Sequence, residues 1–117
     1  NKHILKLWGN GRAKRELIYV DDLADACVYF MNKKTKENII NIGTGKDYTI
    51  KYYARLLLSQ IYPNNKIKIL TDSSKPNGTL RKVLDISTAK KYGWKAKKKL
   101  SYSIKITYKD FKKKYSE

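Results

Sequence analysis

The sequence predicts one mixed α/β domain that spans residues 1–117 and is built from short strands and about four helices. Three observations lead to this prediction. Short apolar or alternating runs at 4–8, 39–42 and 67–70 are typical of strands. Apolar residues recur at helical spacing over 50–61, which predicts an amphipathic helix. The hydrophobic content of 41% is enough for a modest core at this length.

The N-terminal segment is predicted to contain a strand at residues 4–8 and a turn at Gly9-Asn10-Gly11. Residues 16–20 form a second extended segment, which makes a hairpin-like feature flanked by Trp8 and Arg15. An indole stacks on flat rings and a guanidinium grips phosphate, so both side chains are candidates for binding a nucleotide. For Trp8, a place in the core at the end of the strand is equally open.

A helix is predicted to begin at Asp21-Asp22, because an Asp at the N-cap satisfies the unpaired amides of the first turn. Its apolar residues recur on one face: Leu23, Ala26, Cys27, Phe30 and Met31. We expect Cys27, on this face, to be a buried structural thiol rather than a nucleophile. A single cysteine excludes an internal disulfide and a Cys-based zinc site, and it fits a reducing, cytoplasmic setting.

The middle of the chain predicts a strand, a loop and a helix in succession. Residues 39–42 are expected to form a buried strand that runs into the glycine-containing loop 43–47. This loop lacks the ending and the spacing of a P-loop, so a turn is favoured over a phosphate cradle. Thr49 is placed to cap the helix over 50–61, and Pro63 ends it.

The stretch 73–82 carries Lys75, Arg81 and Lys82 and no acid. A tight turn is expected at Pro76-Asn77-Gly78, because proline fixes one backbone torsion and glycine permits a positive one. Such a turn holds cationic side chains in a fixed fan, and Arg and Lys together suit phosphate oxygens. The alternative is a solvated basic loop between two strands.

The remaining elements follow the basic stretch. Residues 83–86 are expected to be extended, and Ser87 caps a short helix that ends before Gly93. Ser101 is expected to cap the last helix. That helix gathers its apolar residues on one side: Ile104, Tyr108, Phe111 and Tyr115.

The formal net charge of +17, from 27 Lys and Arg against 10 Asp and Glu, attracts polyanions. A basic nucleic-acid-binding module is therefore the alternative function. It is disfavoured because the tyrosines at 53, 108 and 115 fall on apolar helical faces and are expected in the core rather than on an exposed basic face. A compositional bias towards lysine also explains the charge. The chain contains no apolar run near the ~20 residues that a membrane span requires, so no membrane partner is expected.

Four segments together resemble the extended short-chain dehydrogenases and, within them, the GDP-L-fucose synthase family. These are Trp8–Gly11 with Arg15–Ala24, Asn41–Ile50, Ser74–Ser87, and Lys91–Trp94. The first two are shared widely among sugar-nucleotide epimerases. The run from Lys75-Pro76 through Arg81-Lys82-Val83-Leu84-Asp85 is similar to the GDP-L-fucose synthases in particular. The resemblance covers nearly the whole chain.

The resemblance implies the C-terminal substrate-binding domain of a longer NADP-dependent epimerase/reductase that acts on GDP-4-keto-6-deoxy-D-mannose. The Rossmann half, with its glycine-rich NADP-binding turn and its catalytic Ser, Tyr and Lys, is then absent from this chain. The chain alone is expected to bind neither NADP nor a metal, and to lack catalysis. The longer enzyme is expected to be a homodimer.

The resemblance also assigns site residues. Trp8 and Arg15 match positions that hold GDP, Lys82 matches a basic residue near the diphosphate, and Asn77 stands where the family has an Asp that contacts substrate. Arg81 and Lys75 complete the cationic set. Asn in place of Asp keeps an acceptor oxygen but loses the charge. Tyr19 replaces a frequent His and Leu80 a frequent Pro, and neither change affects the charged set.

Overall fold

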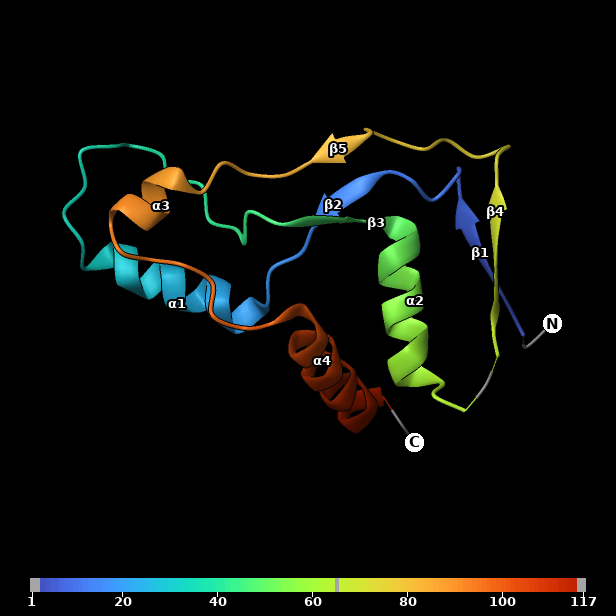
Figure 1. Ribbon diagram of the computed structural model, residues 1–117. Coiled ribbons are helices and arrows are strands. Elements are labelled where there is room, and N and C mark those ends of the chain that lie inside the picture. Colours follow the sequence, from blue (N-terminus) through green and yellow to red (C-terminus); the bar gives the residue numbers. More distant parts are fainter. Residues whose placement is uncertain (1–2, 65, 116–117) are drawn as a thin grey trace.

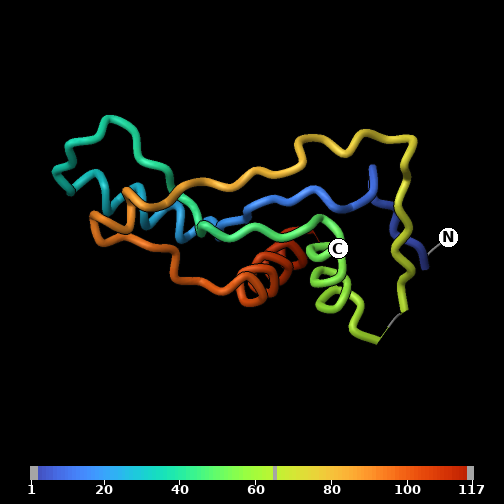
Figure 2. Tube along the Cα trace, turned by 45° about the horizontal axis from the view of Figure 1, so that its top comes forward, coloured from blue at the N-terminus to red at the C-terminus, as the bar shows by residue number. Residues whose placement is uncertain are grey.

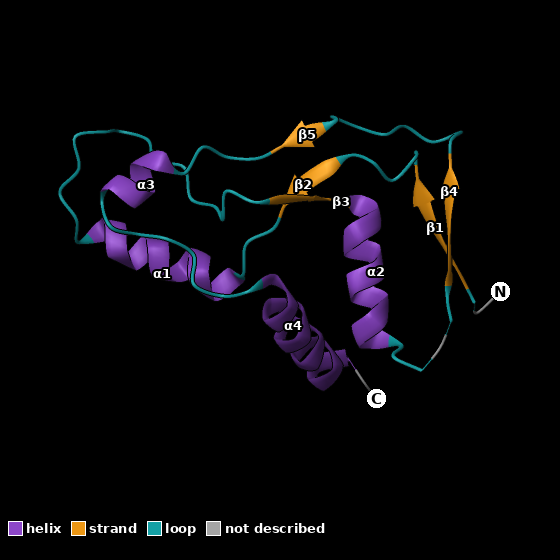
Figure 3. Ribbon diagram, in the orientation of Figure 1, coloured by secondary structure: helices purple, strands orange, loops and turns teal. Residues whose placement is uncertain are grey.

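The computed structural model describes residues 3–64 and 66–115 and confirms a mixed α/β fold of short strands and four helices (Figure 1). In chain order the elements are β1 Ile4–Trp8, β2 Lys14–Glu16, α1 Val20–Met31, β3 Asp47–Thr49, α2 Ile50–Ile61, β4 Lys68–Asp72, β5 Arg81–Lys82, α3 Ser87–Lys91 and α4 Leu100–Tyr115. The helices α1 and α3 lie together at one end, and β1 and β4 lie at the other (Figure 1). Long loops connect the short strands between them (Figure 3).

Two small sheets organise the strands. β1 pairs with β4 in parallel, with Trp8 opposite Asp72. The second sheet has the order β3-β2-β5, with β2 in the centre, antiparallel to β3 and parallel to β5. The predicted hairpin of the N-terminal segment is therefore wrong. The turn after β1 does not return the chain alongside it, because β1 pairs with β4 while β2 pairs with β3 and β5 in the other sheet.

The predicted strand at 39–42 is also wrong. These residues have no strand partner, and Ile39 is 84% exposed. Ile40 and Ile42 instead pack against a small core cluster formed by Ala26, Ala89 and Trp94. The apolar run therefore contributes to the core, but its side chains pack against helices and not within a sheet.

The helix α1 begins at Val20, so Asp21 and Asp22 lie in its first turn and do not cap it. The carboxylate of Asp22, only 5% exposed, accepts hydrogen bonds from the backbone N–H groups of Lys97 (3.1 Å) and Lys98 (2.9 Å). The predicted capping role is wrong, because Asp22 instead attaches the segment before α4 to α1.

The apolar face predicted for α1 is mostly exposed. Ala26 is buried, whereas Leu23, Cys27 and Met31 are exposed, which contradicts the expectation of a buried thiol. The packed side of the helix is defined by Ala26, Tyr29 and Phe30 against the core cluster. Leu23, Cys27 and Met31 therefore form an apolar edge that nothing in the described part of the chain covers.

One of the three predictions of a Ser or Thr cap is confirmed, and two are wrong. Thr49 caps α2 by accepting a hydrogen bond from the N–H of Tyr52 (3.1 Å), as predicted. Ser87 and Ser101 lie inside α3 and α4 and cap neither helix. Of the three tyrosines expected in the core, Tyr53 is buried, but Tyr108 is half-buried and Tyr115 exposed, because every residue from 109 to 115 at the end of α4 is exposed.

The molecule is elongated, with principal extents of 54 × 35 × 19 Å (Figure 2). Its radius of gyration is 17.1 Å, against about 13.4 Å for a compact domain of this length. The accessible surface is 9376 Å², whereas a folded monomer of this size exposes about 6,600 Å². Across the described residues, no helix combines the length and apolar character needed to cross a membrane.

Replacement of Asp22 by Ala should destabilise the fold by about 1–2 kcal/mol, because two backbone N–H groups lose their partner in a part-buried site. Equilibrium urea unfolding measures this effect. Asp21→Ala, in the same turn but exposed, is the control and should cost much less. Equal effects of the two substitutions would contradict the role given to Asp22.

Candidate functional site

Five of the six residues predicted from the sequence lie along neighbouring strand ends and turns, whereas the side chain of Arg81 lies on the opposite face of the sheet and pairs with Asp47. Because β1 and β4 run in parallel and in register, their carboxyl ends are adjacent. The turn at 9–11 and the loop at 73–80 leave from these two ends and therefore lie side by side (Figures 1 and 2). The turn at 9–11 connects Trp8, at the end of β1, to β2. The loop at 73–80 connects β4 to β5. The six are Trp8, Arg15, Lys75, Asn77, Arg81 and Lys82.

Asn77 joins the two turns. Its side-chain Oδ1 accepts a hydrogen bond from the N–H of Asn10 (2.7 Å). Gly9 has a φ of 68° and faces Asn77 so closely that a Cβ on Gly9 would lie 2.9 Å from the Asn77 Cα. Only glycine fits this position without displacing the loop. The acceptor oxygen of Asn77 is thus engaged within the protein, which leaves its amide NH₂ as the group for an outside partner.

Trp8 is 68% exposed, which excludes a place in the core. The Nζ of Lys75 lies 5.7 Å from the centroid of its ring, within cation–π range. An aromatic face and an ammonium group are therefore presented together at the end of β1. This pairing suits a ligand that has both a flat ring and a negative charge.

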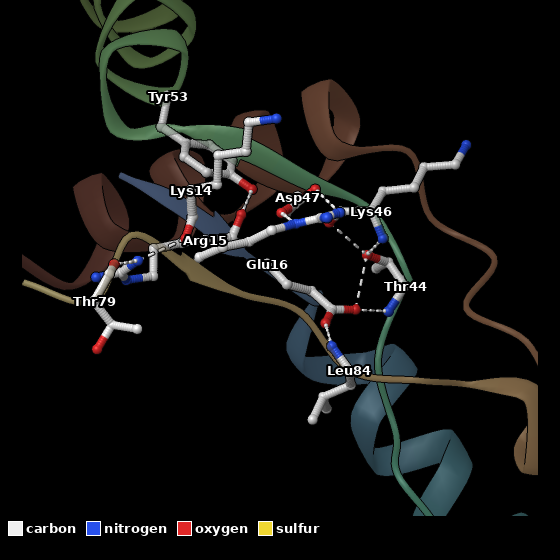
Figure 4. A network of polar contacts seen from close by, with 10 residues as sticks. Lys14, Arg15, Glu16, Thr44, Lys46, Asp47, Tyr53, Thr79 and Leu84 are labelled. Atoms are coloured by element: carbon white, nitrogen blue, oxygen red, sulfur yellow. Dashed lines mark hydrogen bonds and ion pairs between the residues drawn. The ribbon is translucent and has the colours of Figure 1, made fainter. Parts of the chain in front are cut away.

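Arg15 and Lys82 are direct neighbours across the β2–β5 pairing. Residues opposite one another in register project to the same face of a sheet, so the two cations share one face. Arg15 Nη1 donates hydrogen bonds to the carbonyl oxygens of Thr79 (2.6 Å) and Lys14 (2.6 Å), which holds its guanidinium against the basic loop (Figure 4). Lys82 is exposed and takes no part in the ion pairs formed among the described residues.

Arg81 points to the other side of the sheet. Its Nε lies 2.6 Å from Asp47 Oδ2 and its Nη2 lies 3.2 Å from Asp47 Oδ1, so the pair is bidentate across the central strand. The hydrogen bonds from Arg81, together with the nearby charges of Arg81 and Lys14, hold the pKa of the Asp47 carboxyl below its ordinary value. The same pairing raises the pKa of Arg81.

Glu16 is a central residue that the sequence did not indicate. Its carboxylate accepts hydrogen bonds from the backbone N–H groups of Thr44, Gly45 (2.6 Å) and Leu84 (2.8 Å) (Figure 4). It thereby connects two loops on either side of β2. The amides of the loop 43–47, which would serve a phosphate in a P-loop, are occupied here by a carboxylate of the protein itself. The signal available in the sequence was an acid embedded among cations at 12–15.

A cavity of about 890 Å³ lies elsewhere, and none of the six predicted residues lines it. It is bounded by α2, α4 and the segments 17–20 and 96–100, and its walls are mainly apolar. A smaller depression of about 460 Å³ lies beside Lys82, between Glu16 and Leu84. Over the ranges 3–64 and 66–115, no group of three or more His, Cys, Asp or Glu side chains comes together to hold a metal ion.

Comparisons with known proteins agree with the resemblance. The family model described as "NAD dependent epimerase/dehydratase family" matches residues 1–43. "Probable GDP-L-fucose synthase 1" of Oryza sativa subsp. japonica is 40% identical over 103 residues, 88% of this chain and 31% of that protein. "GDP-L-fucose synthase" of Escherichia coli K12 is 33% identical over 114 residues, 90% of this chain and 35% of that protein.

Solved structures show the same relationship. A GDP-6-OMe-4-keto-L-xylo-heptose reductase from C. jejuni matches with a TM-score of 0.85 and 33% identity, over 97% of this chain and 35% of that one. MlghC, a GDP-mannoheptose C4 reductase from Campylobacter jejuni with NADP bound, matches with a TM-score of 0.79 and 33% identity, over 95% of this chain and 35% of that one. The chain thus spans about a third of the length of these relatives.

Replacement of Glu16 by Gln should loosen the two loops that its carboxylate connects. Amide hydrogen exchange at Leu84, or at Thr44 and Gly45 together, is expected to become roughly tenfold faster, because the amide side chain keeps one acceptor oxygen and these two sets of N–H groups use different oxygens of the carboxylate. Glu37→Gln, which alters a distant contact with Lys91, is the control. Unchanged exchange at all three amides in Glu16→Gln would refute this function of Glu16.

Asp47 should stabilise the fold in a pH-dependent manner. Its pKa is lower in the folded chain than the ordinary 3.8, so its contribution is present above that value and is lost as the pH falls through the folded pKa. The difference in Tm between the wild type and Asp47→Asn should be largest near about pH 7 and shrink in acid below about pH 3.8. Thermal unfolding at stepwise pH values measures this. A difference that stays constant with pH would contradict it.

Proposed function

We propose that the chain is the substrate-binding domain of a longer GDP-sugar epimerase/reductase of the NAD dependent epimerase/dehydratase family, whose model matches residues 1–43. We propose that it binds the GDP part of GDP-4-keto-6-deoxy-D-mannose, in a parent enzyme that is an NADP-dependent GDP-L-fucose synthase. The observation that carries the proposal is the exposed indole of Trp8 with the Lys75 ammonium beside it, together with the paired cations Arg15 and Lys82 on the strands that follow the two adjoining turns.

Each component of GDP has a matching group in this region. The guanine ring stacks on Trp8, where base–aromatic stacking contributes about 1–3 kcal/mol. The diphosphate contacts Lys75, Arg15 and Lys82. Arg15 Nη1 is hydrogen-bonded within the protein. Its Nη2 faces Gly78, and because glycine has no side chain, this side of the guanidinium is left open. A Cβ on Gly78 would lie 3.2 Å from Nη2. The amide NH₂ of Asn77 faces the base or ribose.

The chemistry of the reaction belongs to the other part of the longer protein in this proposal. NADP, which a similar reductase holds in its solved structure, binds there together with the catalytic side chains. The present chain holds the nucleotide and thereby orients the hexose. Binding energy from the remote GDP group is used to fix the reacting sugar in place. The chain alone is then not catalytic.

The partner of this domain is the remainder of the longer protein. The surface in excess of a compact monomer is roughly 2,800 Å², comparable to permanent protein interfaces. Exposed apolar residues concentrate on α1, at Val20, Leu23, Val28 and Met31. We propose that they pack against the NADP-binding half. By the family resemblance the longer enzyme is a cytoplasmic homodimer.

Calorimetric titration of the purified chain with GDP tests the proposal. The wild type should bind GDP more tightly than UDP, and Arg15→Ala or Lys82→Ala should weaken binding by roughly tenfold, because each removes a charge-assisted contact with phosphate. Arg55→Ala on α2 and Lys105→Ala on α4, both exposed and remote, are the matched controls.

Two outcomes would count against it. GDP affinity that is unchanged in both site variants would refute the site. Binding of a single-stranded oligonucleotide in place of GDP, abolished by a few-fold rise in salt, would instead support the nucleic-acid-binding alternative.

A further inference from the structure

We propose that Asp47 is a positioning residue for the nucleotide site: by binding Arg81 it fixes Lys82 beside Arg15, where both meet the diphosphate. This inference rests on the proposed function above. Asp47 itself lies on β3, its side chain is only 9% exposed, and it acts on the ligand solely through Arg81 and the strand that Arg81 belongs to.

The strand β5 needs such a tether because it is very short. Only two residue pairs join it to β2, and it forms the edge of the sheet. Side chains supply the missing attachment at three points. Arg15 binds the carbonyl of Thr79, Asp47 binds the side chain of Arg81, and Glu16 binds the N–H of Leu84. These three points bracket Lys82, whose own side chain is exposed.

The register explains why Asp47 controls the direction of Lys82. Arg81 lies opposite Lys14 and Lys82 lies opposite Arg15, so the two basic residues of β5 project to opposite faces. A slip by one residue would exchange them and turn Lys82 towards Asp47. The bidentate pair of Arg81 with Asp47 favours the observed register, because a lysine in that place offers a single point charge in place of a planar fork.

The contact between Asp47 and Arg81 matters because Arg15 and Lys82 repel each other. Arg15 and Lys82 are like charges directly opposite one another, an arrangement that destabilises a strand pair. Without a ligand, this repulsion favours movement of β5 away from β2. The Asp47 carboxylate on the other face opposes that movement, so the cationic pair stays assembled before the anion arrives, and a preorganised site binds more tightly.

The test compares GDP with guanosine, which has the base but no phosphate. Asp47→Asn should weaken GDP binding by up to roughly tenfold, the loss expected when the charge-assisted contact of Lys82 with phosphate is removed, and leave guanosine binding unchanged. Amide exchange at Lys82, whose N–H faces β2 in this parallel pairing, should become faster in the same variant. Arg81→Lys should show the same selective loss to a smaller extent. Asp110→Asn, which removes an exposed ion pair with Lys114 on α4, is the matched control and should alter neither ligand.

Each outcome decides the inference. Equal GDP affinity in Asp47→Asn and wild type would overturn it, and so would an equal loss for GDP and guanosine, which indicates a general loss of structure. If the wild type itself does not bind GDP, the proposed function fails separately. The exchange rate of the Lys82 amide then decides the positioning claim, since unchanged exchange there in Asp47→Asn would overturn it without reference to a ligand.

Discussion

The carboxylate of Glu16 is the interaction on which the rest of the site depends. The strands β2, β3 and β5 are only two or three residues long, so few ladder hydrogen bonds join them. A small sheet of this kind needs further contacts to be stable. Glu16, in the central strand, accepts backbone hydrogen bonds from Thr44 and Gly45 before β3 and from Leu84 after β5. A single side chain thus holds both outer strands, and Arg15 and Asp47 add their own attachments on the two faces.

The pairing of β1 with β4 supplies the second constraint. Parallel strands in register bring their carboxyl ends together, so the turns that follow them meet although they are distant in sequence. Gly9 permits the close approach and Asn77 closes it with a hydrogen bond to Asn10. The consequence is a rigid pair of turns that carries Trp8 and Lys75 on one side and leads to β5 on the other.

Local signals in the sequence predicted local structure well. The strand at 4–8, the cap at Thr49 and the turn after Gly9 depend on near neighbours, and the structure confirms them. The tight turn predicted at Pro76-Asn77-Gly78 is wrong, because the chain turns at residues 73–74 instead, where the N–H of Lys75 donates to the carbonyl of Asp72 (3.2 Å). The strand at 39–42 and the capping role of Asp22 were wrong because tertiary contacts decided them. Ile40 and Ile42 found a helical core, and Asp22 found the amides of Lys97 and Lys98.

The candidate site, too, has features that the sequence predicted and others that depend on tertiary contacts. The residue types of the site were predictable from the resemblance and from the basic loop, whereas the meeting of the two turns was not, because it depends on the parallel pairing of β1 with β4. The pairing of Arg81 with Asp47 and the contacts of Glu16 were not, because they join residues 34 and 28 to 68 positions apart and leave no periodic pattern in the sequence. The binding roles of the six residues remain predictions that ligand experiments decide.

The most direct test of the account follows the two indole N–H signals of the chain by NMR during titration with GDP. Trp8 is exposed at the proposed site, whereas Trp94 is buried and donates its Nε1–H to Asp25 (3.0 Å), so it serves as an internal reference. The account predicts that the Trp8 signal shifts progressively with GDP while the Trp94 signal stays in place. A Trp8 signal that does not move, with shifts confined to residues around the cavity between α2 and α4, would contradict it.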